Sequence, residues 1–199
     1  PRYYDVTAGQ VLVDGVNVKE YTEEALHDKM GFIPQKPVMF NGTIRSNLAF
    51  GTNAHGDMSD EDLMAAARIA QAEEFILKNP EGLNAEVSQG GLNLSGGQKQ
   101  RLAIARAIAR KPEILVFDDS FSALDYKTDR VLRDTLKRET AETTKLIVAQ
   151  RIGTIIDADQ IIVLDKGKVM GRGTHDELMA SNEVYQEIAY SQLSKEELA

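Results

Sequence analysis

Two segments of the sequence have residue types and spacing that suit phosphate chemistry, and the first is residues 94–98. It consists of a leucine, a serine, two glycines and a glutamine: Leu94, Ser95, Gly96, Gly97 and Gln98. Adjacent glycines let the backbone approach a ligand closely, and Ser95 stands where it would cap a following helix. The N–H groups and positive dipole end of that helix would form an anion site. The alternative is an ordinary helix start, because Ser95 and Gln98 also fit a capping box.

The second segment is a pair of carboxylates, Asp118 and Asp119, which directly follows the wholly apolar residues 114–117. Such an apolar run is typical of a strand buried on both faces of a parallel sheet. Ligands of α/β proteins bind outside the carboxyl ends of these strands. Asp118 is therefore a candidate Mg²⁺ ligand, because this hard ion prefers carboxylate and water oxygens. The alternative is that two acidic residues simply end a strand.

The elements that must position these residues alternate between strands and helices. Strands are expected at residues 11–13, 16–18, 31–33, 114–117, 145–149 and 160–164. Helices are expected at residues 23–28, from 59 to about 79, from 98 to 110, at 127–138, and from a capping box at Thr174 onward. Residues 145–149 and 160–164 repeat the apolar character of residues 114–117, so both are expected to be equally buried. The alternation predicts an α/β fold.

Composition excludes several classes of function. The 199 residues are 42% hydrophobic and 27% charged, a globular balance that argues against disorder. The net charge of −8 argues against a nucleic-acid partner held by phosphate contacts. The absence of cysteine excludes disulfides, zinc–thiolate sites and thiol catalysis. The histidines, His27, His55 and His175, are scattered without metal-ligand spacing.

A group of basic residues accompanies the helix predicted at residues 98–110. They are Lys99, Arg101, Arg106, Arg110 and Lys111. Because the chain is acidic overall, we interpret this group as a solvated, phosphate-facing surface rather than a nucleic-acid patch.

Residues 94–107 resemble the signature motif of ATP-binding-cassette (ABC) proteins. The neighbouring motifs follow in that family's order: residues 31–35 resemble its Q-loop, residues 114–119 look like its Walker B strand, and residues 122–125 resemble its D-loop. The resemblance covers essentially the whole chain. It implies that the protein is an ATPase with ATP and Mg²⁺ as cofactors.

The same resemblance implies roles for individual residues. Asp118 and Gln35 would contribute to the Mg²⁺ site, and Gln35 would also sense the γ-phosphate region. Asp125, in the D-loop, would lie along an interface between two such domains. The signature residues would complete the ATP site of the partner domain: Ser95, Gly96, Gly97 and Gln98.

The resemblance also implies a P-loop NTPase (RecA-like) fold. A mainly parallel core sheet would carry a small antiparallel β part and an inserted α-helical signature subdomain. Residues 1–199 would form one ABC ATPase domain, with the helical subdomain at 50–110 and the remaining core at 111–199. The family's phosphate-binding loop, Gly-x-x-x-x-Gly-Lys-Ser/Thr, does not occur in the sequence. We therefore expect a piece of a longer protein that is inactive and aggregation-prone by itself.

Two segments resemble exporters in particular. Residues 39–47 are similar to the segment that contacts the coupling helices of exporter transmembrane domains, and residues 86–91 stand where exporters carry the X-loop. Gln89 replaces the acidic residue usual in that loop. The implied partner is a transmembrane domain, and the implied location is the cytoplasmic face of the cell membrane.

Two positions depart from the family pattern. Asp119 stands where the family has its catalytic glutamate, and Gln150 stands where it has its switch histidine. Loss of one methylene withdraws the carboxylate by about 1.5 Å, and misplacement by about 1 Å can cost roughly 10²-fold in rate. Glutamine can donate a hydrogen bond to a phosphate but cannot carry positive charge. Together the two changes indicate a degenerate hydrolysis site beside an intact signature.

The resulting hypothesis is a heterodimeric exporter. The partner chain would supply a glutamate and a histidine at the matching positions, and most hydrolysis would take place in the site that this chain's signature completes. Two alternatives stay open. One is a non-hydrolytic, ATP-clamped regulatory module, and the other is a soluble ABC ATPase of DNA repair or translation.

Overall fold

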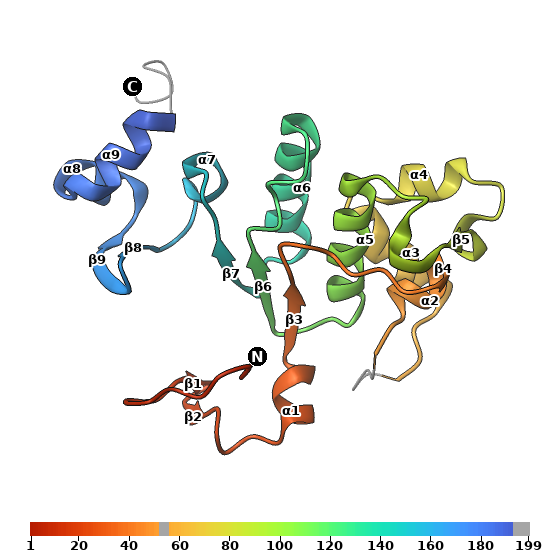
Figure 1. Ribbon diagram of the computed structural model, residues 1–199, viewed down its shortest axis with the longest axis horizontal. Helices are drawn as coiled ribbons and strands as arrows, with labels where there is room; N and C mark the ends of the chain where they lie inside the picture. The colour runs from red at the N-terminus through yellow and green to blue at the C-terminus, as the bar shows by residue number, and fades with distance from the viewer. Residues whose placement is uncertain (52–55, 193–199) are drawn as a thin grey trace. The chain divides into compact units, whose positions relative to one another are not determined.

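The computed structural model describes residues 1–51 and 56–192, which belong to two compact units (Figure 1). Unit 1 is Pro1–Leu146 and unit 2 is Ile147–Ala199. His55 lies outside the described residues.

Parallel pairing of two strands organises unit 1. β3 (Met30–Ile33) pairs in parallel with β6 (Ile114–Asp118), and Ile33 lies opposite Phe117. β7 (Thr144–Val148) follows β6 in the strand order of this sheet. Within β6, Leu115 is 1% exposed and Phe117 is fully buried. The predicted α/β fold is confirmed, and so is the buried parallel strand at residues 114–117.

The approach of β3 to its neighbours depends on Gly31. A Cβ at this position would lie 2.8 Å from a methyl of Leu115 and 3.1 Å from the carbonyl oxygen of Ala107. Any larger side chain would push β3 away from β6 and from the helix that contains Ala107. The glycine therefore fixes where β3 ends, two residues before Gln35.

That helix, α5 (Gly96–Ala109), is buried along most of its length. Leu102, Ile104 and Ala105 are fully buried. The helix packs against α2 (Ile44–Leu48), against α3 (Asp60–Ile69) and against β3. It begins two residues earlier than predicted because Ser95 caps it.

The single helix predicted from residue 59 to about 79 is wrong. α3 ends at Ile69 and a second helix, α4, covers Glu73–Lys78. Between them Gln71 adopts a left-handed conformation with φ of 57°. This break buries Ala70 and Ala72 completely on either side of the turn. The predicted start is confirmed, since Ser59 caps α3 in a capping box with Asp62.

Short elements complete unit 1. β1 (Leu12–Val13) and β2 (Val16–Asn17) form the predicted antiparallel hairpin around Asp14 and Gly15, which both have positive φ. The remaining elements are α1 (Glu23–Asp28), the antiparallel pair β4 (Gly42–Thr43) and β5 (Glu86–Val87), the 3₁₀ turns η1 (Gly82–Asn84) and η2 (Gln89–Gly91), and α6 (Tyr126–Glu139).

Unit 2 has its own apolar cluster, formed by residues from strands and helices of that unit. Its elements are α7 (Ile152–Ile155), β8 (Ile161–Asp165), β9 (Lys168–Gly173), α8 (His175–Ser181) and α9 (Glu183–Gln192). Ile161 and Val163 of β8 pack with Leu178 and Tyr185. The predicted capping box of Thr174 and Glu177 is confirmed.

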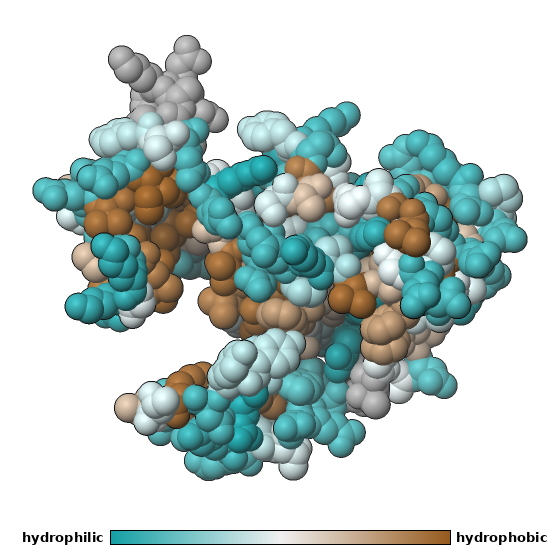
Figure 2. All heavy atoms as spheres, viewed as in Figure 1, coloured by the Kyte–Doolittle hydropathy of each residue, from teal (hydrophilic) through white to brown (hydrophobic). Residues whose placement is uncertain are grey.

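The expectation that residues 145–149 and 160–164 are buried on both faces is wrong. β8 pairs antiparallel with β9, and its Ile162 and Leu164 are 54% and 65% exposed. The cluster of unit 2 packs on the other face of β8 only. In β7, Leu146 and Val148 are also more than half exposed. Figure 2 shows hydrophobic side chains gathered on the visible surface of unit 2.

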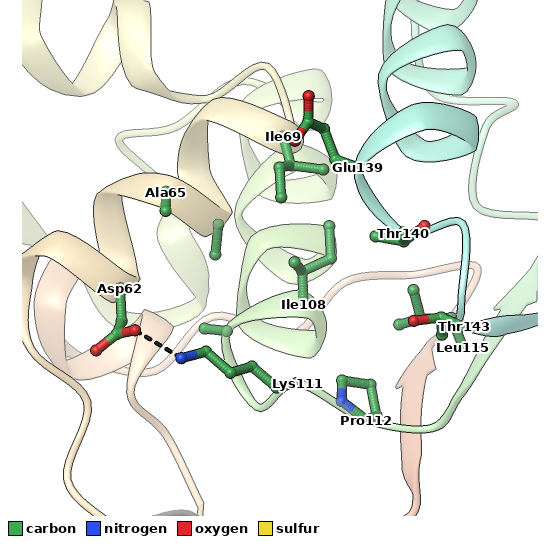
Figure 3. Close-up of a pocket in the computed structure, with 12 residues that line it drawn as sticks. Asp62, Ala65, Ile69, Ile108, Lys111, Pro112, Leu115, Glu139, Thr140 and Thr143 are labelled. Atoms are coloured by element: carbon green, nitrogen blue, oxygen red, sulfur yellow. Dashed lines mark hydrogen bonds and ion pairs between the residues drawn. The ribbon is translucent and has the colours of Figure 1, made fainter.

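A cavity of about 270 Å³ lies in unit 1 among α3, α5 and the turn after α6 (Figure 3). Its wall is largely apolar, with Ile69, Ile108 and Leu115 among the lining residues. Asp62 and Lys111 form an ion pair of 2.8 Å on one side, and Thr140 and Thr143 lie on the opposite side. Among the described residues, no helix is both long enough and apolar enough to cross a membrane.

Burial of α5 predicts a stability difference between two leucines. Leu102→Ala should lower the free energy of unfolding of unit 1 by about 2–5 kcal/mol, because it leaves a cavity in a fully buried site. Leu92→Ala should change it by less than about 0.5 kcal/mol, since Leu92 is 84% exposed. Hydrogen exchange of the slowest α5 amides in increasing denaturant measures both. Equal losses in the two variants would contradict the packing described.

The ion pair between Asp62 and Lys111 beside the cavity predicts how the Asp62 carboxyl titrates. The hydrogen bond from Lys111, followed by those from Ser59, lowers the pKa of Asp62 to about 2. A depressed folded-state pKa stabilises the fold above the unfolded value of about 3.9, and this contribution is lost as the pH falls toward 2. Lys111→Met should raise the pKa of Asp62 toward its ordinary value, as followed by NMR titration of its carboxyl carbon. An unchanged pKa in this variant would exclude Lys111 as the main cause.

Candidate functional site

The structure brings Gln35 and Asp119 together at one edge of the sheet. β3 and β6 are parallel, so their carboxyl ends lie at the same edge, with Ile33 opposite Phe117. Gln35 follows the end of β3, and Asp118 is the last residue of β6. The side-chain Nε2 of Gln35 donates a hydrogen bond to Oδ2 of Asp119 over 3.1 Å. Three of the predicted site residues therefore meet where ligands of α/β sheets bind.

The turn after β6 holds Asp119 in a defined place. Asp119 has a φ of 45°, in the left-handed region that aspartate tolerates better than most residues. The hydroxyl of the fully buried Ser120 donates to the carbonyl of Ile33 over 2.8 Å, which joins the ends of the two strands. The hydroxyl of Ser122 donates to the carbonyl of Asp119 over 2.9 Å. The backbone of this turn is thus held by hydrogen bonds on both sides of the Asp119 side chain.

The side chains at this edge offer oxygen donors that suit Mg²⁺. Asp118 is partly buried and carries a carboxylate at the strand end, and Gln35 adds an amide oxygen. In the described part of the chain, no group of three or more His, Cys, Asp and Glu could hold a metal ion by itself. Proteins bind Mg²⁺ through one or two carboxylates together with water and phosphate oxygens.

At the signature segment the capping box is present. The Ser95 hydroxyl accepts from the Gln98 backbone N–H over 3.2 Å, and the Ser95 N–H donates to Oε1 of Gln98 over 2.9 Å. Ser95 and Gly96 are exposed. The box leaves the backbone N–H groups of Gly96 and Gly97 in the first turn without an intrahelical acceptor. The capping box therefore does not prevent the free N–H groups of the same helix start from binding an anion, so the two interpretations of residues 94–98 do not exclude each other.

The D-loop segment lies against the start of α5. A Cβ at Gly97 would come within 3.7 Å of the Ala123 carbonyl oxygen and 3.9 Å of the Leu124 side chain. Asp125 caps α6 and accepts from the Thr128 N–H over 2.9 Å. This backbone hydrogen bond is the main reason that the pKa of Asp125 lies below its usual value. Within unit 1, the signature and the D-loop thus form one continuous surface.

Gln150 lies in unit 2, two residues after the end of β7, and is exposed. Its backbone carbonyl accepts from Nε2 of Gln192 over 2.8 Å, while Oε1 of Gln192 accepts from the Ile152 N–H over 2.9 Å. The structure therefore groups Gln35, Asp118 and Asp119 in unit 1 and places Gln150 in the other unit.

The interpretation of the basic residues as a solvated, phosphate-facing surface is wrong for Arg101 and Arg106, which are partly buried, whereas the Lys111 side chain is 65% exposed. Lys99 donates to the Gly90 carbonyl, Arg110 pairs with Asp28 and Lys111 pairs with Asp62. Arg101 and Arg106 are partly buried and donate to backbone carbonyls. Burial lowers the pKa of Arg106 to about 10, so it stays charged at neutral pH.

Sequence reasoning missed two buried polar side chains near the site, Gln100 and Ser120, and a third, Asn47, on α2. Gln100 is fully buried on α5, and its Nε2 lies 3.4 Å from the carbonyl of Pro34, next to Gln35. Its Oε1 is buried and has no hydrogen-bond partner among residues 1–51 and 56–192. A detectable signal existed, since Gln100 shares a helix face with Ala103 and Ala107, and a polar residue within an apolar face usually has a specific partner.

Comparison with known proteins agrees with these motifs. The family profile for ABC transporters matches residues 2–122. An uncharacterised ABC transporter ATP-binding protein of Mycobacterium bovis is 47% identical over 96% of this chain and 32% of its own length. A candidate multidrug export ATP-binding/permease protein of Staphylococcus aureus is 39% identical over 94% of this chain and 32% of its own length.

A solved structure shows the same fold. A bacterial Atm1-family ABC exporter with ATP bound matches with a TM-score of 0.91 and 38% identity, over 98% of this chain and 34% of that chain. The chain thus spans about a third of the length of the relatives it matches. The parallel core sheet, the small antiparallel pairs and the helices described above are those of an ABC nucleotide-binding domain. The chain therefore belongs to the ABC transporter family, as an ATP-binding domain.

Proposed function

We propose that this chain is the part of an exporter that binds ATP and couples its hydrolysis to transport across a membrane. The observation that carries the proposal is the meeting of Gln35 and Asp119 at the sheet edge where Asp118 ends β6. The names of two relatives, a candidate multidrug export protein and an Atm1-family exporter, support the direction of transport. The same names weigh against a soluble ATPase of DNA repair or translation.

Each predicted site residue has a place in this function. Asp118 and Gln35 would hold Mg²⁺, which when bound neutralises charge on the ATP phosphates. Asp119 would orient the attacking water, and the Gln150 amide would donate to a phosphate oxygen. The exposed Ser95 and the first N–H groups of α5 would bind phosphate in a partner domain's site. Asp125 would lie along the interface between the two domains.

We also propose that one inserted helical subdomain, residues 50–110, carries the signature within a single ATPase domain of residues 1–199, and that residues 111–199 continue its core. Packing of α3 and α4 with one another, and of α3 with α5, supports a helical group of this kind. The exposed surface residues Val38 and Phe40 would face the coupling helices of a transmembrane domain at the cytoplasmic side of the membrane.

The chain's own hydrolysis site would be degenerate, and its partner would be a different chain. Asp119 is one methylene shorter than glutamate and is already hydrogen-bonded to Gln35. Gln150 cannot carry the positive charge of a histidine. The partner would supply a glutamate and a histidine at the matching positions. The capping geometry at Ser95 supports an intact contribution of this chain to the partner's site.

The test restores the family's residues at positions 119 and 150 in the full-length protein. In a complex whose partner site is inactivated, Asp119→Glu combined with Gln150→His should raise ATP turnover by at least roughly 10-fold, because a carboxylate misplaced by about 1 Å costs on the order of 10²-fold. Steady-state phosphate release measures this turnover, with nucleotide occupancy confirmed by filter binding. Asp119→Asn is the matched control and should give no gain.

Two outcomes would count against this account. Unchanged turnover in the double variant, with ATP bound, would mean that Asp119 and Gln150 do not limit hydrolysis. Absence of single-turnover hydrolysis in the unaltered complex would favour the ATP-clamped regulatory module instead.

A further inference from the structure

Arg106 on α5 has an unusual environment for a charged side chain. It is partly buried, and in the described part of the chain all of its acceptors are uncharged. A guanidinium carries five N–H donors and is costly to bury unless they are satisfied. The partly buried Arg106 guanidinium has no carboxylate partner in the described part of the chain, so neighbouring uncharged groups must satisfy its N–H donors.

The acceptors of Arg106 all come from one short segment. Its Nε donates to the Asn47 carbonyl over 2.6 Å, and its two terminal nitrogens donate to the Val38 carbonyl and to Oδ1 of Asn47, each over 3.0 Å. The Asn47 carbonyl belongs to the last turn of α2, where carbonyls have no intrahelical donor. One side chain of α5 thus joins both ends of residues 38–47.

Two aromatic rings close over the same guanidinium. Phe40 and Phe50 stack with centroids 4.0 Å apart and planes 17° apart. The central carbon of the Arg106 guanidinium lies 5.5 Å from the Phe40 centroid and 5.8 Å from the Phe50 centroid, within the range of cation–π attraction. Both residues are more than one-third exposed to solvent. The segment therefore has an inner face held by Arg106 and an outer face open to a partner.

Asn47 completes the arrangement. It is fully buried, accepts from the Phe40 N–H over 2.9 Å and donates to the carbonyls of Phe40 and Thr43. The segment is thereby a closed loop with internal hydrogen bonds. Arg106 supplies the polar attachment of this loop to α5, beside the apolar packing of α2 on the same helix.

The other end of α5 carries the signature. From Gly96 to Arg106 the helix rises by about 15 Å. Its middle is closely packed around the buried Leu102 and Ile104, and such packing makes a helix stiff. The helix thus connects Ser95–Gln98 directly with Arg106.

We propose that Arg106 is a positioning residue that fastens residues 38–50 to α5, so that this surface segment follows the signature end of the helix when nucleotide binds. This inference rests on the proposed function, because the displacement starts with ATP at the signature. Arginine is required, since three acceptors in different directions and two ring faces suit a planar fork rather than a lysine ammonium. A side chain that only filled space at position 106 would not couple residues 38–50 to the signature end of α5.

The test is hydrogen exchange in the full-length protein with and without ATP and Mg²⁺. In the unaltered protein, ATP should change the exchange both of the amides at the start of α5 and of those of Phe40, Ile44 and Ala49. In Arg106→Met, the amides of residues 38–50 should exchange at least roughly 10-fold faster without nucleotide, because their anchor is lost. Their response to ATP should disappear, while that of the α5 start persists.

Two variants serve as comparison. Arg110→Met removes a guanidinium from the next turn of the same helix, which contacts Asp28 instead, and should leave the response of residues 38–50 intact. Arg106→Lys keeps the charge and should retain a reduced response, so it also tests the proposal if Arg106→Met does not fold.

The outcomes separate the two proposals. A full response of residues 38–50 in Arg106→Met or in Arg106→Lys would overturn the role of Arg106. So would a response in the unaltered protein at the start of α5 that does not extend to residues 38–50. No response to ATP anywhere in the unaltered protein would instead refute the proposed function.

Discussion

Burial of α5 is the constraint on which the rest of unit 1 depends. The helix packs on α2, α3 and β3, and its apolar residues are fully buried in the middle. Gly31 allows β3 to approach it closely, which places Gln35 beyond the strand end. Its N-terminus is exposed at Ser95, while its polar side chains reach backbone carbonyls of the surrounding loops. One helix therefore joins the exposed signature residues at its N-terminus to distant surface segments.

The parallel pairing of β3 and β6 explains why Gln35, Asp118 and Asp119 lie together. Because both strands end at the same edge, residues far apart in sequence meet there, and Ser120 joins the two ends. The left-handed turn at Asp119 directs its carboxylate toward the Gln35 amide. An aspartate suits this backbone conformation, whereas the family's glutamate would extend the carboxylate further from the same anchor.

Features set by local sequence could be predicted, and features set by tertiary contacts could not. The Ser95 capping box, the apolar strand at residues 114–117 and the Asp14–Gly15 hairpin follow from neighbouring residues, and the structure contains all three. The break at Gln71 and the exposed face of β8 depend on which elements pack nearby, so periodicity alone misled. Arg101 and Arg106 were misassigned because they have acceptors that lie 30 and 68 residues away in sequence, respectively. The motif positions Asp119 and Gln150 could be located from sequence, but the contact between Asp119 and Gln35 required the sheet.

The central claim is that this chain binds ATP at the edge of β3 and β6 and offers the start of α5 to a second nucleotide site. The most direct measurement is a cryo-electron-microscopy structure of the full-length protein in lipid nanodiscs with ATP and Mg²⁺. The account predicts phosphate density beside Asp118 and Gln35, and separate phosphate density at the N-terminus of α5 from a nucleotide held by another domain. ATP bound elsewhere, with both Asp118 and Ser95 facing solvent, would contradict it.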